Sequence, residues 1–206
     1  MALADAYATY DQYKAAIGGQ GDARQDLIER ALLVASRLIE SPPWTGRIFN
    51  QTAAGVVRYF DGNDDAELWI DDLVSVSAIG VDVDQDGTYS QAIGTGHVIK
   101  RPRNAAEIGH PFTSLELRAG LGAALALWPA GLDVKITGAW GWPSVPAPIT
   151  SAAIILARQI LDLEDAGLTM TLQAVDEQVQ VRPGVGLLLH NLHQAYRRHM
   201  PGVAGF

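Results

Sequence analysis

Residues 134–157, VKITGAWGWPSVPAPITSAAIILA, change from the periodicity of a strand to that of a helix. The first residues alternate apolar and polar side chains, as a half-buried strand does. A corner of glycine, tryptophan and proline follows, and Pro148 then stands where the first turn of a helix tolerates proline. From Ile149 onwards, apolar residues cover nearly the whole circumference of the helix. This predicts a helix buried inside the fold or between subunits.

Helical patterns also flank this stretch at both ends of the chain. Thr9 and Gln12 have the spacing of a capping box, in which each side chain accepts a hydrogen bond from an otherwise unpaired backbone N–H. Helical spacing predicts three further helices, over residues 10–17, 22–40 and 186–199. Residues 169–181 alternate loosely, which fits a strand or an extended arm.

The middle of the chain has the period of β-strands. Residues 56–60 and 67–70 flank a turn with the sequence DGND, which predicts a hairpin. Further strands are expected over residues 74–83, 89–100, 112–118 and 132–137. The predicted fold class is therefore α+β. Its N- and C-terminal helices form a bundle from residues 1–50 and 144–206, with a β-rich insertion of hairpins over residues 51–143.

The amino-acid composition excludes several classes of protein. A chain of 206 residues is long enough for a substantial core. It contains no cysteine, which excludes disulfides, thiolate metal sites and thiol nucleophiles. The net charge of -8 argues against a general phosphate-binding surface. We expect neither a signal peptide nor a membrane-spanning helix, because the N-terminus lacks the required pattern and no run of 18 apolar residues occurs.

One local excess of basic residues lies near the C-terminus. It consists of His190, His193, Arg197, Arg198 and His199. Cations at a helix C-terminus interact favourably with the helix dipole. That role, or contact with a partner, is favoured over nucleic-acid binding.

Residues 82–87, DVDQDG, match the first half of a calcium-binding loop, with Asp82, Asp84 and Asp86 as weak candidate metal ligands. The second half of the motif is missing, because Ile93 occupies the position that should supply a bidentate glutamate. An Asp-Gly pair between strands is a common hairpin signal. The hairpin is therefore the favoured interpretation.

No combination of residues suggests catalysis. Asp71 and Asp72 are adjacent, so on a strand they point to opposite faces, and a turn or strand end is the role we expect for them. His190 and His193 lack a third metal ligand at matching spacing. Phosphate-binding loops and nucleophile elbows are absent from the sequence. We therefore predict that the protein is not an enzyme and uses no cofactor.

Three tryptophans lie at expected junctions between elements: Trp44, Trp140 and Trp142. Each needs a buried environment for its ring and an acceptor for its indole N–H. They either close corners of the monomer or anchor a neighbouring subunit, since tryptophan is enriched in interface hot spots.

Several segments, in this order, resemble the head-tail adaptor (connector) proteins of long-tailed bacteriophages and of gene transfer agents. They are residues 39–49 with WTGRIF at 44–49, LWIDDLVSV at 68–76 leading into residues 81–89, TGAWGWP at 137–143 within residues 134–157, and AYRR at 195–198. The most distinctive of these is the TGAWGWP corner before a buried helix.

The resemblance implies a structural subunit of a twelve-membered ring that docks beneath the portal protein and presents a surface to a stopper or tail protein. DNA would pass through the ring without specific binding. The protein would assemble in the host cytoplasm and reside in the virion, at the head-tail junction. The implied portal-contact residues are Leu192, Tyr196, Arg197 and Arg198, and those of a structural corner or subunit interface are Trp44, Arg47, Trp140, Trp142 and Pro143.

Two other hypotheses remain open. The first is a carbohydrate or small-ligand binding module built on the strands, with Trp69 or Trp140 as a stacking platform. The second is a metal-dependent hydrolase that uses Asp82, Asp84 or the C-terminal histidines, and it ranks last.

Overall fold

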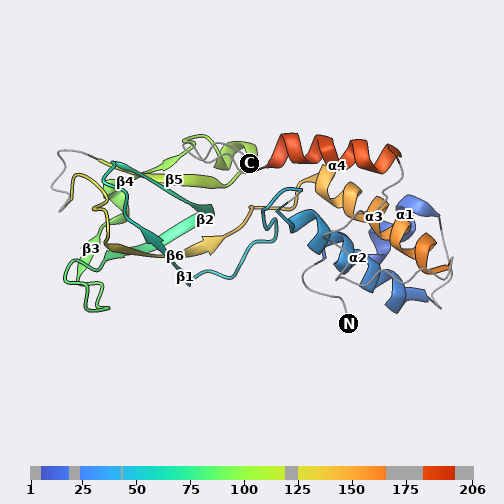
Figure 1. The fold of residues 1–206 in the computed structure, drawn as a ribbon, viewed down its shortest axis with the longest axis horizontal. Helices are drawn as coiled ribbons and strands as arrows, with labels where there is room; N and C mark the ends of the chain where they lie inside the picture. The colour runs from blue at the N-terminus through green and yellow to red at the C-terminus, as the bar shows by residue number, and fades with distance from the viewer. Residues whose placement is uncertain (1–5, 19–23, 43, 119–124, 166–182, 198–206) are drawn as a thin grey trace. The chain divides into compact units, whose positions relative to one another are not determined.

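The computed structural model describes residues 6–18, 24–42, 44–118, 125–165 and 183–197. The chain divides into two compact units. One, the helical unit, comprises Met1–Arg47 and Val145–Phe206, and the other, the sheet unit, is Ile48–Ser144. Figure 1 shows the elements of each unit.

The helical unit contains α1 (Tyr10–Ile17), α2 (Gln25–Glu40), α3 (Ala147–Asp165) and α4 (Pro183–Tyr196). The capping box is confirmed, because Thr9 Oγ1 accepts from Gln12 N and the Gln12 side chain accepts from Thr9 N. The predicted bounds of α1 are also confirmed. Helix α2 begins after Arg24, and the first two residues of the helix predicted over residues 22–40 lie outside the described residues.

Helix α3 begins two residues before Ile149 and buries most of its apolar side chains. It packs along α2, and it contacts α1 and α4 over smaller areas. One stripe of α3 stays open, since Ser151, Ile155 and Arg158 are exposed. The nearly continuous apolar pattern of α3 therefore does not correspond to complete burial within this chain.

The sheet unit holds six strands in one antiparallel sheet: β1 (Val56–Asp61), β2 (Glu67–Val81), β3 (Gln91–Ile93), β4 (Val98–Arg101), β5 (Phe112–Leu117) and β6 (Asp133–Trp140). The strand order is β1-β6-β2-β5-β4, with β3 paired to β2. Two short 3₁₀ turns, Thr95–His97 and Ala106–Ile108, lie between strands.

The long strand β2 organises the sheet. Its first half pairs with β5, and its second half pairs with β6 and, at its end, with β3. The register shifts between Trp69 and Leu73, where the strand changes partners. Asp71 and Asp72 lie at this irregularity within the strand, so the turn or strand end expected for them is wrong.

The predicted strand over residues 89–100 is also wrong as a single element. Gly94 and Gly96 interrupt it, and the pieces on either side become β3 and β4. These pair with different neighbours, because β3 joins β2 and β4 joins β5. Glycine in a strand pattern often marks such a break.

The expected fold class, a bundle of terminal helices carrying an insertion of separate hairpins, is wrong. The strands form a single six-stranded sheet, and the helices do not form a terminal bundle. Helices α2 and α3 pack against each other along their lengths, whereas α1, of 8 residues, contributes little to the packing. The hairpin expected from residues 56–60 and 67–70 is also wrong, because β6 lies between β1 and β2 and pairs with both. The alternating pattern located the strands but not their partners.

The core of the sheet unit centres on Leu68, Ile70, Leu115, Ile136 and Trp128. The indole of Trp128 donates to the carbonyl oxygens of Ala66 and Leu115, at 3.0 and 3.1 Å. None of the helices in the described ranges combines the length and the apolar character that a membrane crossing requires.

Candidate functional surfaces

The Gly-Trp-Pro corner at the end of β6 is built into the core of the sheet unit. Gly141 has φ of 98°, and a Cβ there would lie 2.2 Å from the carbonyl oxygen of Asn50. Only glycine fits this position without displacement of the backbone. The two tryptophans on either side of Gly141 therefore enter the core from a fixed turn, whereas Pro143 is exposed.

Trp140 is fully buried and has a complete set of partners. Its indole N–H donates to the Val56 carbonyl oxygen over 2.9 Å, and the Arg58 guanidinium lies 4.8 Å from its ring centre. Arg58 also forms a 2.7 Å ion pair with Asp71. Trp140 is therefore no stacking platform for a sugar, while Trp69 remains partly exposed on β2.

Trp142 occupies a second buried position. Its indole N–H donates to a carboxylate oxygen of Asp72 over 3.0 Å. The rings of Phe49 and His110 lie 5.2 and 4.8 Å from its ring, centre to centre. Asp71 and Asp72 thus have separate partners and do not converge on one substrate position.

In the helical unit, the loop after α2 contacts the end of α4. His193 Nδ1 lies 2.5 Å from the Trp44 carbonyl oxygen, to which it donates, and Arg47 Nη1 donates to the Tyr196 carbonyl oxygen over 3.4 Å. Two of the segments behind the family resemblance, residues 44–49 and 195–198, therefore meet through Arg47 and Tyr196. Among the described residues, His190 and His193 do not belong to any group of three side chains that could hold a metal ion.

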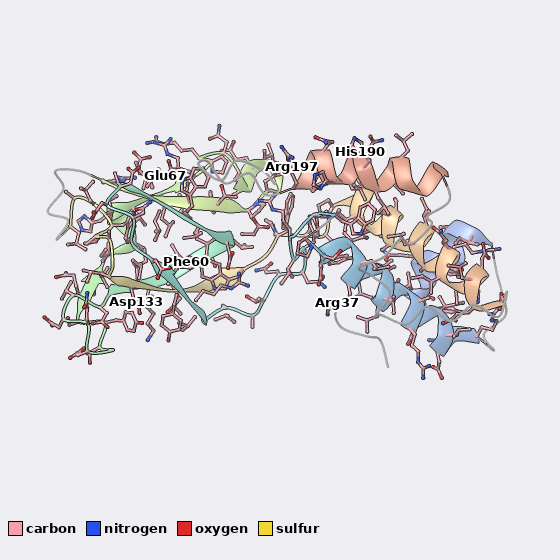
Figure 2. All side chains as sticks on the ribbon, in the orientation of Figure 1. Arg37, Phe60, Glu67, Asp133, His190 and Arg197 are labelled. Atoms are coloured by element: carbon pink, nitrogen blue, oxygen red, sulfur yellow. The ribbon has the colours of Figure 1, made fainter. Side chains whose placement is uncertain are left out.

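The portal-contact residues implied by the resemblance lie in different environments. Leu192 is 4% exposed, so its side chain faces the interior of the helical unit. Tyr196 is half-buried, and this burial raises the pKa of its hydroxyl. Arg197 is exposed just after the last turn of α4 (Figure 2), and Arg198 lies outside the described residues.

The acidic loop over residues 82–87 has a structural role in the sheet unit. The buried Asp82 carboxylate accepts from the backbone N–H groups of Asp86 and Gly87, at 3.2 and 2.8 Å. Asp84 and Asp86 are exposed. The loop joins the antiparallel strands β2 and β3, as the hairpin interpretation expected. Within the described ranges, no three His, Asp or Glu side chains lie close enough together to hold a metal ion.

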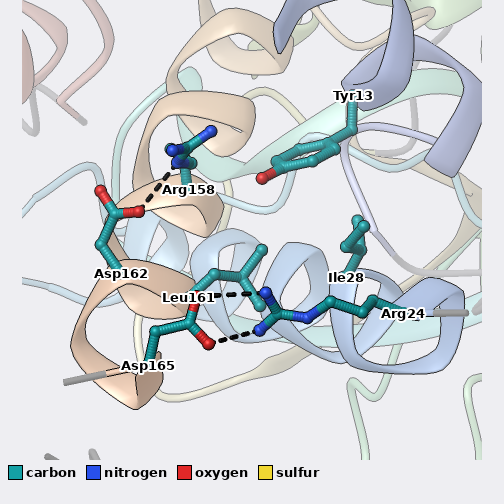
Figure 3. A pocket seen from close by; sticks show the side chains of 7 residues that line it. All are labelled: Tyr13, Arg24, Ile28, Arg158, Leu161, Asp162 and Asp165. Atoms are coloured by element: carbon teal, nitrogen blue, oxygen red, sulfur yellow. Dashed lines mark hydrogen bonds and ion pairs between the residues drawn. The ribbon is translucent and has the colours of Figure 1, made fainter. Parts of the chain in front are cut away.

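A small enclosed space near the ends of α1, α2 and α3 is lined by charged groups and by Tyr13 (Figure 3). Its volume is about 30 Å³, comparable to one water molecule. Both Arg24 guanidinium N–H groups donate to Asp165, at 3.1 and 2.6 Å, and Arg158 Nε donates to Asp162 at 2.9 Å. The Arg24–Asp165 pair joins the start of α2 to the end of α3, whereas the Arg158–Asp162 pair lies within α3.

The ion pairs and the burial around this space shift the pKa values of several side chains. The hydrogen bond from Arg24 holds the pKa of the Asp165 carboxyl below its usual value, and it raises the pKa of Arg24. Burial raises the pKa of the Tyr13 hydroxyl. Each shift follows from a structural pair or from burial, and none prepares a general acid or base near neutral pH.

An open groove of the helical unit lies between α1 and α3. Its volume is about 350 Å³, and it is lined by Ala16, Ile17, Ser151, Ile154, Ile155, Arg158, Gln159 and Asp162. Ile155 is 41% exposed in it. The groove is mainly apolar, with the Arg158–Asp162 ion pair at one end.

Gln159 gives this groove a polar feature that its residue type alone does not predict. Its side chain is only 8% exposed, yet its amide oxygen has no hydrogen-bond partner among the described residues. A buried acceptor without a partner destabilises a fold by about 1–3 kcal/mol. The groove therefore combines uncovered apolar surface with a buried amide oxygen that has no partner among the described residues.

Sequence reasoning missed Gln159 and Trp128. Gln159 lies within an otherwise apolar helical run. A polar residue at a position that the helical pattern predicts to be buried was the signal that could have drawn attention to it. Trp128 precedes Pro129 and lacks a strand pattern around it, so local periodicity gave no reason to place it in the core.

No protein-family model matches this chain. No curated protein is significantly similar to it in sequence.

Proposed function

We propose that this protein is a head-tail adaptor subunit of a tailed bacteriophage or gene transfer agent, which forms a ring beneath the portal protein. The observation that carries the proposal furthest is the groove between α1 and α3, where Ile155 is exposed and the Gln159 amide oxygen is unpartnered within the described residues. Such a surface fits permanent contact with protein better than it fits water.

The occupant of the groove, in this proposal, is a neighbouring copy of the chain. A ring requires head-to-tail contacts, in which one surface of a subunit binds a different surface of the next. On α4, Leu187 is 63% exposed, and His190 and Asn191 stand one helical turn further along on the same face. The exposed Leu187 side chain complements the apolar lining of the groove.

The end of α4 is the proposed portal-facing surface. It is attached to the loop that holds Trp44 and Arg47. Arg197 is exposed there, and Arg198 follows it in the sequence. Arginine suits such a contact because its planar guanidinium binds carboxylates through two parallel hydrogen bonds.

The charge of the chain supports a conduit rather than a DNA-binding protein. With a net charge of -8, the protein offers few cations to replace the counterions of the phosphate backbone. DNA can then pass without being held. The proposed role needs neither catalysis nor a cofactor.

Electron microscopy of the purified chain mixed with the portal protein encoded beside it tests this proposal. We expect ring-shaped complexes on the portal with the wild-type chain, and their loss with Ile155→Glu, which places a charge in the groove. Ile108→Glu is the matched control, because Ile108 is even more exposed but lies in the sheet unit. Absence of any ring over a range of salt concentrations would contradict the proposed function.

A further inference from the structure

The outer edge of β1 is an open backbone edge. Within the part of the chain that the structure describes, strand β1 is the first strand of the sheet and pairs only with β6. Gly62 N donates to the Leu132 carbonyl oxygen, over 3.0 Å, and this pair continues the register of β1 with β6. Because bonding and non-bonding pairs alternate along antiparallel strands, Val56, Arg58 and Phe60 bond to β6. The N–H and C=O groups of Val57, Tyr59 and Asp61 therefore point away from the sheet.

Val56, Val57 and Tyr59 are exposed apolar or aromatic side chains along this edge, and Asp61 at its end is exposed and charged. Tyr59 is 59% exposed, and Val56 and Val57 are each more than a third exposed. On the same face of the sheet, the Tyr89 ring lies 5.6 Å from that of Tyr59, and Lys135 Nζ lies 5.2 Å from the Tyr89 ring. The Tyr59 and Tyr89 rings thus form an aromatic surface, and Tyr59 is its member on the edge strand.

The opposite edge of the sheet is protected, whereas the β1 edge is not. Strand β4 has 4 residues, includes Lys100 and Arg101, and runs directly into Pro102. Short length, lysine and proline are the devices by which natural sheets prevent edge-to-edge pairing. Strand β1 has 6 residues, no lysine and no proline. Of its two charged side chains, Arg58 is paired with Asp71, and Asp61 is exposed at the end of the strand. This contrast within one sheet indicates that the β1 edge is kept available for a partner strand.

We propose that β1 pairs with β1 of a second copy of this chain, antiparallel, about a twofold axis at Tyr59. The three residues with outward backbone groups are spaced symmetrically about Tyr59, so the edge complements itself. Tyr59 lies opposite Tyr59 of the second copy, and Val57 lies opposite its Asp61. All three pairs are of the type that exchanges two backbone hydrogen bonds. An aromatic cross-strand pair adds to the stability of the joint.

This joint belongs to the sheet unit and does not rest on the proposed function, whose groove lies in the helical unit. A twofold contact joins two subunits through the same surface and closes on itself. It therefore predicts an even-numbered assembly of the isolated chain, with the dimer as its smallest form.

Two single substitutions at the edge test the pairing by light scattering coupled to size-exclusion chromatography. Val57→Pro removes one outward N–H at an edge position that tolerates proline, and Tyr59→Lys places like charges opposite each other. We expect the wild-type chain to be dimeric and both variants to be monomeric. Lys100→Pro, at an outward position of β4, is the matched control and leaves the dimer intact.

Cross-linking gives a second readout that does not depend on disrupting the edge. The chain has no cysteine, so Tyr59→Cys carries a single thiol. Residues in such a pair have Cα atoms about 5.5 Å apart, within the range that a disulfide spans. We expect rapid disulfide-linked dimer formation on oxidation, and much slower formation with Ile108→Cys, an exposed control away from the edge. A monomeric wild-type chain, a dimer that survives Val57→Pro and Tyr59→Lys, or equal rates for the two cysteine variants would each overturn the proposal.

Discussion

The indole N–H of Trp142 donates to the carboxylate of Asp72 across 3.0 Å, and both residues are buried in the sheet unit. This bond connects the corner after β6 to the point in β2 where the strand changes partners. Because a hydrogen bond to a charged group in a buried position is among the stronger ones, the pair stabilises the corner more than its single contact suggests.

Trp142→Phe is expected to lower the free energy of unfolding by about 2–4 kcal/mol, because it removes the donor to Asp72 and part of a buried ring. Trp69→Phe provides the control on the partly exposed face of β2, where we expect a change within about 0.5 kcal/mol. Urea unfolding followed by circular dichroism measures both. Equal effects of the two substitutions would show that the corner contributes nothing beyond apolar burial.

Gly141→Ala is expected to destabilise the protein more than Gly87→Ala. Both glycines have positive φ, of 98° and 82°, so alanine is strained at each. Only at Gly141 would the new Cβ also collide with a backbone oxygen, while nothing lies within 4 Å of it at Gly87. We expect a loss of about 1 kcal/mol for Gly87→Ala and of more than about 3 kcal/mol for Gly141→Ala. Thermal unfolding of the two variants side by side distinguishes backbone strain from collision.

The Arg24–Asp165 pair makes part of the stability dependent on pH. The pKa of Asp165 is lower in the folded chain than in the unfolded one, because Arg24 donates to its carboxylate. Its stabilising contribution is therefore present above the unfolded pKa of about 3.9 and is lost as pH falls through the folded pKa. We expect Asp165→Asn to melt below wild type at neutral pH and to approach it in acid.

Glu107→Gln is the control for that titration, because Glu107 is an exposed carboxylate in the sheet unit. Melting temperatures of the three proteins, measured from neutral pH down to about pH 2, give the comparison. A difference between wild type and Asp165→Asn that stays constant over this range would mean that the ion pair does not set the pKa of Asp165.

Local sequence signals correctly located the helix start and the turn that depend only on neighbouring residues. The capping box at Thr9 fixed the start of α1, and the hairpin signal at residues 82–87 marked the turn between β2 and β3. The partners of strands could not be obtained in this way. Strand β6 pairs with β1 and β2 through contacts between residues far apart in the sequence, and alternation carries no information on which strand lies alongside.

The candidate surfaces, too, combine features with local causes and features that depend on contacts between distant residues. The pattern of α3 predicted apolar burial, but only the packing of α1 and α2 against it determines that Ile155 stays exposed and that Gln159 is covered. The open edge of β1 likewise depends on the strand order and on the parity of its bonds with β6. The buried partners of Trp140 and Trp142 come from β1 and β2, so their roles too required the assembled sheet.

Two leucines on α4 separate a role in folding from a role in binding the portal. Leu192 is 4% exposed and Leu187 is 63% exposed, although they lie 5 residues apart on the same helix. Leu192→Ala is expected to lower the free energy of unfolding by about 2–5 kcal/mol, because it leaves a cavity in the helical unit. Leu187→Ala is expected to change it by less than about 0.5 kcal/mol.

The same pair of variants tests how α4 takes part in assembly. If Leu187 contacts a neighbouring subunit, its replacement weakens ring formation while urea unfolding stays unchanged. Leu192→Ala, by contrast, should weaken portal binding only in proportion to the unfolded fraction, and it should recover in conditions that restore the fold. Loss of portal binding by a fully folded Leu192→Ala chain would mean that α4 leaves the helical unit to bind the portal through its buried face.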